Sequence, residues 1–175
     1  MKNVSYWYDN ANVLQRLHGL PRKMTSMHNA RNVAEFVLHE LCQKQCFDIP
    51  RAAYFIDNPD YDCMKGVAGY SQQESFDKDD IWSCPLDFTS YMQGSAFNNA
   101  VRKLNRQSCH RHNEPIEEVA TQIAHELGIN QVGCCIVAMP HDNHGILVYE
   151  KIVEDPQDKE CLMNGASLLS FCPIY

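Results

Sequence analysis

The stretch IEEVATQIAHELGINQVGCCIVAMPHDNHGILVYEKIV, residues 116–153, decides the fold class. Apolar residues recur at helical spacing as far as Leu127, and Gly128 follows as a stop signal, so this part predicts a helix. Residues 131–139 are mostly apolar and predict a buried strand, and the turn-forming letters PHDNHG separate them from a return strand over 146–153. A helix followed by a two-stranded hairpin indicates a mixed α+β fold.

The remaining elements extend this hairpin into a sheet. Residues 51–57 (RAAYFID) and 64–70 (MKGVAGY) predict a second hairpin, and residues 82–88 a further strand. Apolar spacing and stop signals predict helices at 9–17, 26–45, 94–104, 114–128 and 158–172, and a short edge strand or loop at 105–113. The expected fold class is α+β, with a mainly antiparallel central sheet and helices on both faces. We expect residues 1–28 to form a helical extension and residues 29–175 the domain proper.

Composition narrows the function classes. The chain has 175 residues, a formal net charge of −7 and 45% apolar residues, which fits one globular domain. Its acidic balance argues against direct nucleic-acid binding, because a phosphate backbone attracts basic surfaces. No apolar stretch approaches the ~20 residues of a membrane span, and the opening MKNVSYWYDN lacks the apolar core of a secretory signal. With nine cysteines and no CxxC pair, we expect free thiols in the cytoplasm.

Aromatic residues suggest where a small molecule binds. Aromatic side chains with a few polar tips supply both burial and orientation in ligand sites. The candidates lie on the first hairpin and around the helix expected at 94–104, and they are Tyr54, Tyr70, Phe88, Tyr91, Phe97 and Val101. The alternative interpretation is that these side chains form ordinary core.

A second constellation is Cys109, His110 and His112. One thiolate and two imidazoles suit iron or zinc, and alternate residues of a strand face the same side. The favoured interpretation is a polar surface edge, with non-haem iron or zinc as the alternative. His141 and His144 would join such a site if the fold brings them near. We interpret the pair His39 and Glu40 as a helix-surface pair, because the HExxH spacing of zinc proteases is absent there.

The order of elements resembles a GAF domain, the sensory relative of PAS domains. The resemblance covers residues 29–172 and is carried by RAAYFID (51–57), GSAFNNAVRKLN (94–105), the helix that leads into QVGCCIVAMP, and HGILVYEKIV (144–153). It implies a noncatalytic, cytoplasmic signal-input domain that binds a small molecule or a partner and controls a separate effector. The effector implied is transcriptional, as in bacterial sigma-54-dependent activators with an N-terminal input domain of this kind.

The resemblance leaves other outcomes open. GAF domains often form homodimers through their terminal helices, so we expect a dimer of this kind. One alternative is a cysteine-dependent GAF-fold enzyme that resembles the free methionine sulfoxide reductases, with Cys63, Cys84 and Cys109 as the cysteines in loop or edge positions. Another is an iron- or zinc-based gas or redox sensor. A third is a fold that binds a partner without any ligand.

Overall fold

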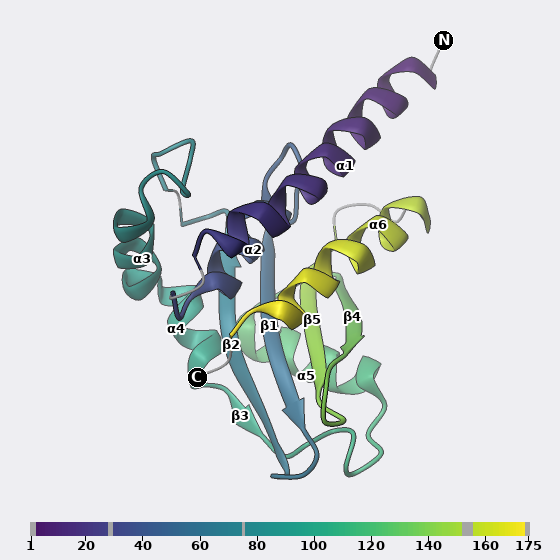
Figure 1. The fold of residues 1–175 in the computed structure, drawn as a ribbon. Helices are drawn as coiled ribbons and strands as arrows, with labels where there is room; N and C mark the ends of the chain where they lie inside the picture. Colours follow the sequence, from purple (N-terminus) through teal and green to yellow (C-terminus); the bar gives the residue numbers. More distant parts are fainter. Residues whose placement is uncertain (1–2, 28–29, 75, 152–155, 174–175) are drawn as a thin grey trace.

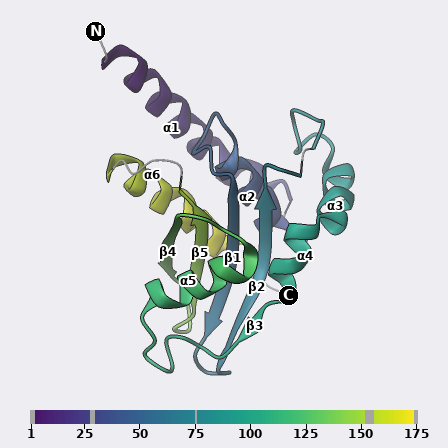
Figure 2. The same cartoon turned by 180° about the vertical axis from the view of Figure 1, so that it is seen from behind.

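The computed structural model describes residues 3–27, 30–74, 76–151 and 156–173, with side chains from residue 11 to residue 151 and from residue 159 onward outside the gaps. These ranges contain a five-stranded antiparallel sheet with strand order β3-β2-β1-β5-β4, six α-helices and a short 3₁₀ helix. The elements are α1 (Asn3–Thr25), α2 (Val33–Cys42), β1 (Arg51–Asn58), β2 (Cys63–Ser71), α3 (Pro85–Gly94), α4 (Ala96–Lys103), β3 (Asn105–Arg106), α5 (Ile116–Leu127), β4 (Val132–Ala138), β5 (His144–Glu150), α6 (Pro156–Ser167) and η1 (Leu168–Phe171). The predicted α+β class with helices on both faces is confirmed (Figures 1 and 2).

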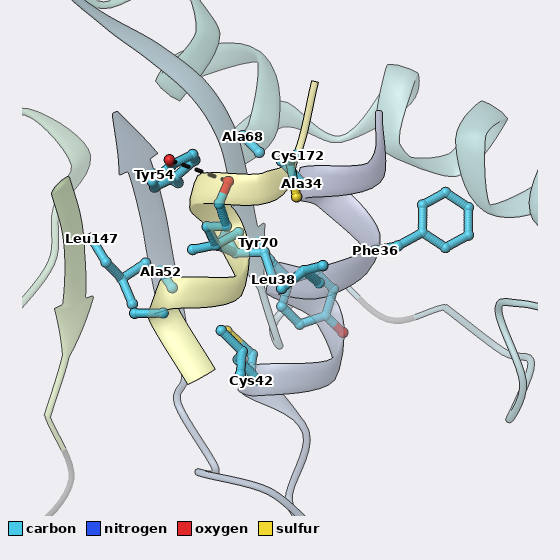
Figure 3. Close-up of a cluster of buried hydrophobic side chains, with 14 of the residues drawn as sticks. Ala34, Phe36, Leu38, Cys42, Ala52, Tyr54, Ala68, Tyr70, Leu147 and Cys172 are labelled. Atoms are coloured by element: carbon cyan, nitrogen blue, oxygen red, sulfur yellow. Dashed lines mark hydrogen bonds between the residues drawn. The ribbon is translucent and has the colours of Figure 1, made fainter. Parts of the chain in front are cut away.

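Helices α1, α2 and α6 cover one face of the sheet (Figure 1). The larger core lies beneath them, where Leu38 and Leu41 of α2 meet Ala52 and Leu147 of the sheet. Figure 3 shows part of this core. The buried α1 side chains Val13, Leu17 and Leu20 belong to the same core. The expected helical extension, residues 1–28, thus contributes apolar side chains to this core.

Helices α4 and α5 cover the opposite face (Figure 2), and two glycines set how closely α4 approaches. A Cβ atom on Gly66 would lie 1.9 Å from the carbonyl oxygen of Val101, and one on Gly69 would lie 2.5 Å from Val101 Cγ2. No side chain fits in these spaces, so β2 needs glycine here for the helix to pack directly on its backbone.

Three predicted elements are wrong in type or extent. Residues 82–88 do not form a strand, because Pro85 begins α3 as the first helical residue, where its missing N–H costs nothing. The first helix does not end near Gly19 and Pro21 but continues to Thr25, because buried contacts of Leu17 and Leu20 hold it across the proline. The helix expected at 26–45 is shorter, since α2 spans Val33–Cys42.

The hairpins and the middle helices match the prediction more closely. β1 and β2 pair from Arg51↔Ser71 to Asn58↔Cys63, and β4 and β5 pair from Val132↔Glu150 to Ala138↔His144. The last two residues of the expected return strand, 152–153, lie outside the described residues. In the part of the chain that the structure describes, no helix has the length and apolar character needed to cross a membrane.

Candidate functional site

Helix α2 is buried along its whole length. All ten of its residues are buried, including the polar side chains of Glu35, His39 and Glu40. Helices of globular proteins usually keep one polar face in water. Because buried polar groups need partners, the surroundings of these three side chains define the polar interior of the molecule.

Glu35 and Asn98 tie α2 to the opposite side of the sheet. The fully buried amide of Asn98 donates to Glu35 Oε1 at 2.9 Å and to the Met92 carbonyl oxygen at 3.0 Å, and its oxygen accepts from the Gly69 N–H at 2.9 Å. Asn32 donates to the other Glu35 oxygen at 3.0 Å. These bonds use the polar atoms of Asn98 fully, so this network is structural.

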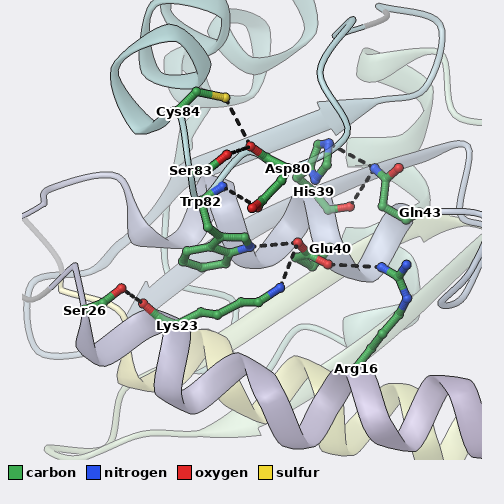
Figure 4. Close-up of polar contacts among 10 residues, drawn as sticks. All are labelled: Arg16, Lys23, Ser26, His39, Glu40, Gln43, Asp80, Trp82, Ser83 and Cys84. Carbon is green, nitrogen blue, oxygen red and sulfur yellow. Dashed lines mark hydrogen bonds and ion pairs between the residues drawn. The ribbon is translucent and has the colours of Figure 1, made fainter.

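Glu40 joins three separate segments (Figure 4). Its Oε1 accepts from the indole N–H of Trp82 at 2.7 Å, and Lys23 of α1 lies 3.9 Å from the same oxygen. Its Oε2 accepts from Arg16 of α1 at 3.4 Å. One buried carboxylate therefore holds both α1 and the segment that leads into α3.

His39, the neighbour of Glu40, is neutral. Burial, with a smaller contribution from Arg16, lowers the pKa of His39 from 6.5 to about 4. The side-chain nitrogen of Gln43 lies 3.1 Å from His39 Nε2 and also donates to the His39 carbonyl oxygen at 3.0 Å. Because an amide nitrogen can only donate, Nε2 is the acceptor and the ring hydrogen is assigned to Nδ1. That Nδ1 is buried and has no hydrogen-bond partner among the residues that the structure describes.

Aromatic rings surround the unpaired donor. The rings of Tyr70 and Phe88 meet the imidazole edge-on, with centroids 5.0 and 5.1 Å away. Phe88 contacts Tyr91 at 5.9 Å and Phe76 at 5.4 Å. We call these five residues, His39, Tyr70, Phe76, Phe88 and Tyr91, the His39 cluster. It combines packed aromatic rings with an N–H that has no partner among the described residues, and sites for small organic molecules use this combination of aromatic and polar groups.

Glu74 binds the end of α3 and the start of α4 beside this cluster. Its backbone oxygen accepts from the Tyr91 hydroxyl, and its side chain accepts from the Ser95 hydroxyl and, at 2.9 Å, from the Phe97 N–H. Residues 76–82, which we call the cover, place Phe76 against Phe88 and Trp82 on Glu40 of α2.

The structure divides the six predicted ligand residues among three places. Tyr70, Phe88 and Tyr91 come together in the His39 cluster. Tyr54 lies on the same face of the sheet but is bound elsewhere, because its hydroxyl donates to the Leu169 carbonyl oxygen at 3.4 Å (Figure 3). The last two, Phe97 and Val101, pack against Gly69 on the opposite face.

The surface-pair interpretation of His39 and Glu40 is wrong. Both side chains are buried, at 7% and 9% exposure. The sequence VAEFVLHELC carried a signal that predicts this, because its apolar residues surround the helix instead of forming one stripe.

The predicted metal residues lie at the far end of the sheet. Cys109 donates to Asp57 Oδ2 at 3.3 Å, the His110 N–H donates to the same oxygen at 3.0 Å, and His112 lies 2.8 Å from Asp62. His144 does lie near this group, with its ring centroid 4.2 Å from that of His110. However, the described residues contain no group of three side chains placed to hold a metal ion.

The Cys109 thiol is protonated in this setting. Burial, together with the hydrogen bond to the Asp57 carboxylate, raises the pKa of Cys109 to about 12. Thiols act as nucleophiles and metal ligands in their deprotonated form. This surrounding therefore opposes both roles and makes Cys109 a hydrogen-bond donor to a buried carboxylate.

Comparison with known proteins leaves the family open. No protein-family model matches the chain, and no curated protein matches it. The likeness to GAF domains therefore rests on the order of elements and the sequence patterns alone.

Proposed function

We propose that this chain is a noncatalytic sensing domain of the GAF type, which binds a small organic molecule at the His39 cluster and controls an effector through α1. The proposal rests on two adjacent residues of α2, His39 and Glu40. His39 presents an unpaired buried N–H among aromatic rings, and Glu40 anchors α1. One helix thus carries the ligand site and the output contact on adjacent residues.

The chemistry of the cluster defines the ligand class. A neutral imidazole with a free Nδ1–H calls for an acceptor, such as a carbonyl or phenolic oxygen. The edge-on rings of Tyr70 and Phe88 favour a flat, apolar body. We therefore propose an uncharged, ring-containing molecule with one exposed oxygen acceptor.

Movement of the cover couples ligand binding to helix α1. A ligand reaches His39 when the cover, residues 76–82, moves, and this movement breaks the bond between Trp82 and Glu40. Glu40 then keeps Arg16 and Lys23 of α1 as its partners, in a more exposed setting. If the ligand has a higher affinity for the state in which the cover is open, binding shifts the population of α1 conformations.

The downstream partner is a separate effector, and we propose transcription as its output and the cytoplasm as its location. Helix α1 extends beyond the edge of the sheet (Figures 1 and 2), where an effector can contact it. The protonated thiol of Cys109 argues against Cys109 as the nucleophile of the reductase alternative, because a nucleophile of that kind needs a reactive thiolate.

Native mass spectrometry tests the ligand site. The purified chain is equilibrated with a small-molecule extract of cells, freed of unbound compounds and weighed. We expect the wild type to retain an organic molecule of defined mass and His39→Phe to lose it. The matched control is His125→Phe on the exposed face of α5, which should retain it. Equal retention by wild type and His39→Phe, or retention of nothing by the wild type, contradicts the proposal.

A further inference from the structure

Strand β4 forms one edge of the sheet and is open along its outer side. It pairs with β5 over seven residues without a register shift, and the strand order places nothing beyond it. The opposite edge is β3, which has two residues. β4 is therefore the long free edge of this sheet within the described chain.

The hydrogen bonds at its two ends identify the outward backbone groups. The Lys151 N–H donates to the Gln131 carbonyl oxygen, and the Met139 N–H donates to that of Asn143, both at 2.9 Å. In an antiparallel pair, residues that exchange hydrogen bonds alternate with residues whose groups point away. Since residues 131 and 139 point toward β5, so do 133, 135 and 137. The outward groups belong to Val132, Cys134, Ile136 and Ala138, and none of them bonds to the backbone of another described element.

The strand lacks the features that usually protect an edge. Natural proteins guard open edges with charged residues, proline or bulges. The sequence VGCCIVA contains no charged residue and no proline. Its Ile136 is 40% exposed. In a chain of net charge −7, this uncharged edge can meet an identical edge without charge repulsion.

We propose that a second copy of this chain pairs its β4 antiparallel with this β4, so that the two sheets become one continuous sheet of ten strands. A two-fold axis at Cys135 gives the register. It sets Cys134 opposite Ile136 and Val132 opposite Ala138 of the second copy, so the outward N–H and C=O groups of all four residues find partners. An axis at Cys134 or at Ile136 leaves some of these groups unpaired. The occupant is a second copy because this register is its own complement, apolar against apolar at every position.

The terminal helices leave this surface available. The apolar residues Val13, Leu17 and Leu20 of α1, and Leu162 and Ala166 of α6, are buried inside the chain. A dimer through those faces would have to displace them, whereas β4 pairs without breaking any described contact. The inference is independent of the ligand site, which lies at the other end of the strand order, beside β2.

Sedimentation and light scattering across a concentration series test the dimer. We expect a wild-type mass of twice the 20.1 kDa of one chain. Ile136→Lys should return it to the mass of one chain, because two ammonium groups would be buried diagonally across the interface. The matched control Leu86→Lys changes an 81% exposed leucine on α3 and should leave the dimer intact. Circular dichroism verifies that each variant is folded.

Two further measurements fix the register. Ile136→Pro removes an outward N–H without touching the bonds to β5, so it should also abolish the dimer and keep the fold. Hydrogen exchange should show the Cys134 and Ile136 amides protected in the wild-type dimer, and exposed once dilution gives the monomer. A wild type that stays monomeric up to about 1 mM overturns the proposal, since such an interface would be too weak to be specific. A dimer in which the Cys134 amide exchanges freely overturns it as well.

Discussion

The buried imidazole of His39 gives α2 a hydrogen-bond donor in an apolar setting. This imidazole has one nitrogen bound by Gln43, and the other nitrogen has no partner in the part of the chain that the structure describes. An unsatisfied buried donor costs free energy in the empty state. A ligand oxygen that accepts a hydrogen bond from this N–H removes that cost. We therefore expect the hydrogen bond to His39 to contribute most to the free energy of binding.

The low pKa of His39 makes stability depend on pH. In the unfolded chain His39 takes up a proton near pH 6.5, but in the folded chain it does so near pH 4. The free energy of unfolding is therefore highest above pH 6.5 and falls between pH 6.5 and pH 4, by up to about 3 kcal/mol from this group. Urea unfolding at a series of pH values measures this. His39→Phe should remove most of the slope, and the exposed-site control His125→Gln should keep it.

Asn98 is the residue whose loss should be most costly among the polar side chains. Asn98→Ala leaves Glu35 Oε1, the Gly69 N–H and the Met92 carbonyl with one partner fewer in a buried setting. We expect a loss of about 3 kcal/mol in the free energy of unfolding. Asn99→Ala, one residue along α4, removes a bond at the surface and should cost under about 0.5 kcal/mol. Equal losses in the two variants would contradict the structural role of Asn98.

At the scale of elements, the hairpins and α5 could be predicted because local pattern and tertiary position agree there. Gly128, in the left-handed conformation with φ 66°, ends α5 as its position in the sequence suggests. A strand was predicted at residues 82–88 because their apolar content was given more weight than Pro85. A proline of this kind is a helix-start signal, and Pro85 begins α3. Helix α1 was predicted too short because Gly19 and Pro21 are local stop signals, and the packing that overrides them is not local.

The packing of α4 on β2 leads to a prediction about glycine. Gly66→Ala places a Cβ against the Val101 backbone, which cannot move without shifting α4. We expect the free energy of unfolding to fall by about 3 kcal/mol, toward the upper end of what overpacking costs. The control is Gly19→Ala in α1, where a Cβ meets nothing within 4 Å, and it should stabilise the chain by up to about 1 kcal/mol. Thermal and urea unfolding distinguish these opposite signs.

The anchor of α1 can be tested without any ligand. Glu40→Gln keeps an acceptor for Trp82 but removes the charge that attracts Arg16 and Lys23. Amide hydrogen exchange over residues 11–25 should become about threefold to tenfold faster, as expected for the loss of roughly 1 kcal/mol in local stability. Exchange in α5 should stay the same. Glu126→Gln, which alters an exposed carboxylate on α5, should leave α1 unchanged; unchanged α1 exchange in Glu40→Gln would show that α1 is held by its apolar contacts alone.

At the scale of the whole molecule, three of the six predicted ligand residues meet in the His39 cluster. Tyr70, Phe88 and Tyr91 come together, since they lie on segments that meet above β2. Phe97 and Val101 cannot join them, because α4 crosses to the other face of the sheet. That crossing depends on chain topology, which the spacing of aromatic residues does not encode.

The central claim is that binding at the His39 cluster changes how α1 is held. The most direct measurement compares amide hydrogen exchange over residues 11–25 before and after adding the small molecule that native mass spectrometry identifies. We expect exchange in α1 to change on binding, exchange in α5 to stay constant, and Glu40→Gln to reduce the change. Binding at His39 with no change in α1 exchange would contradict the claim and leave a ligand-binding domain without this output.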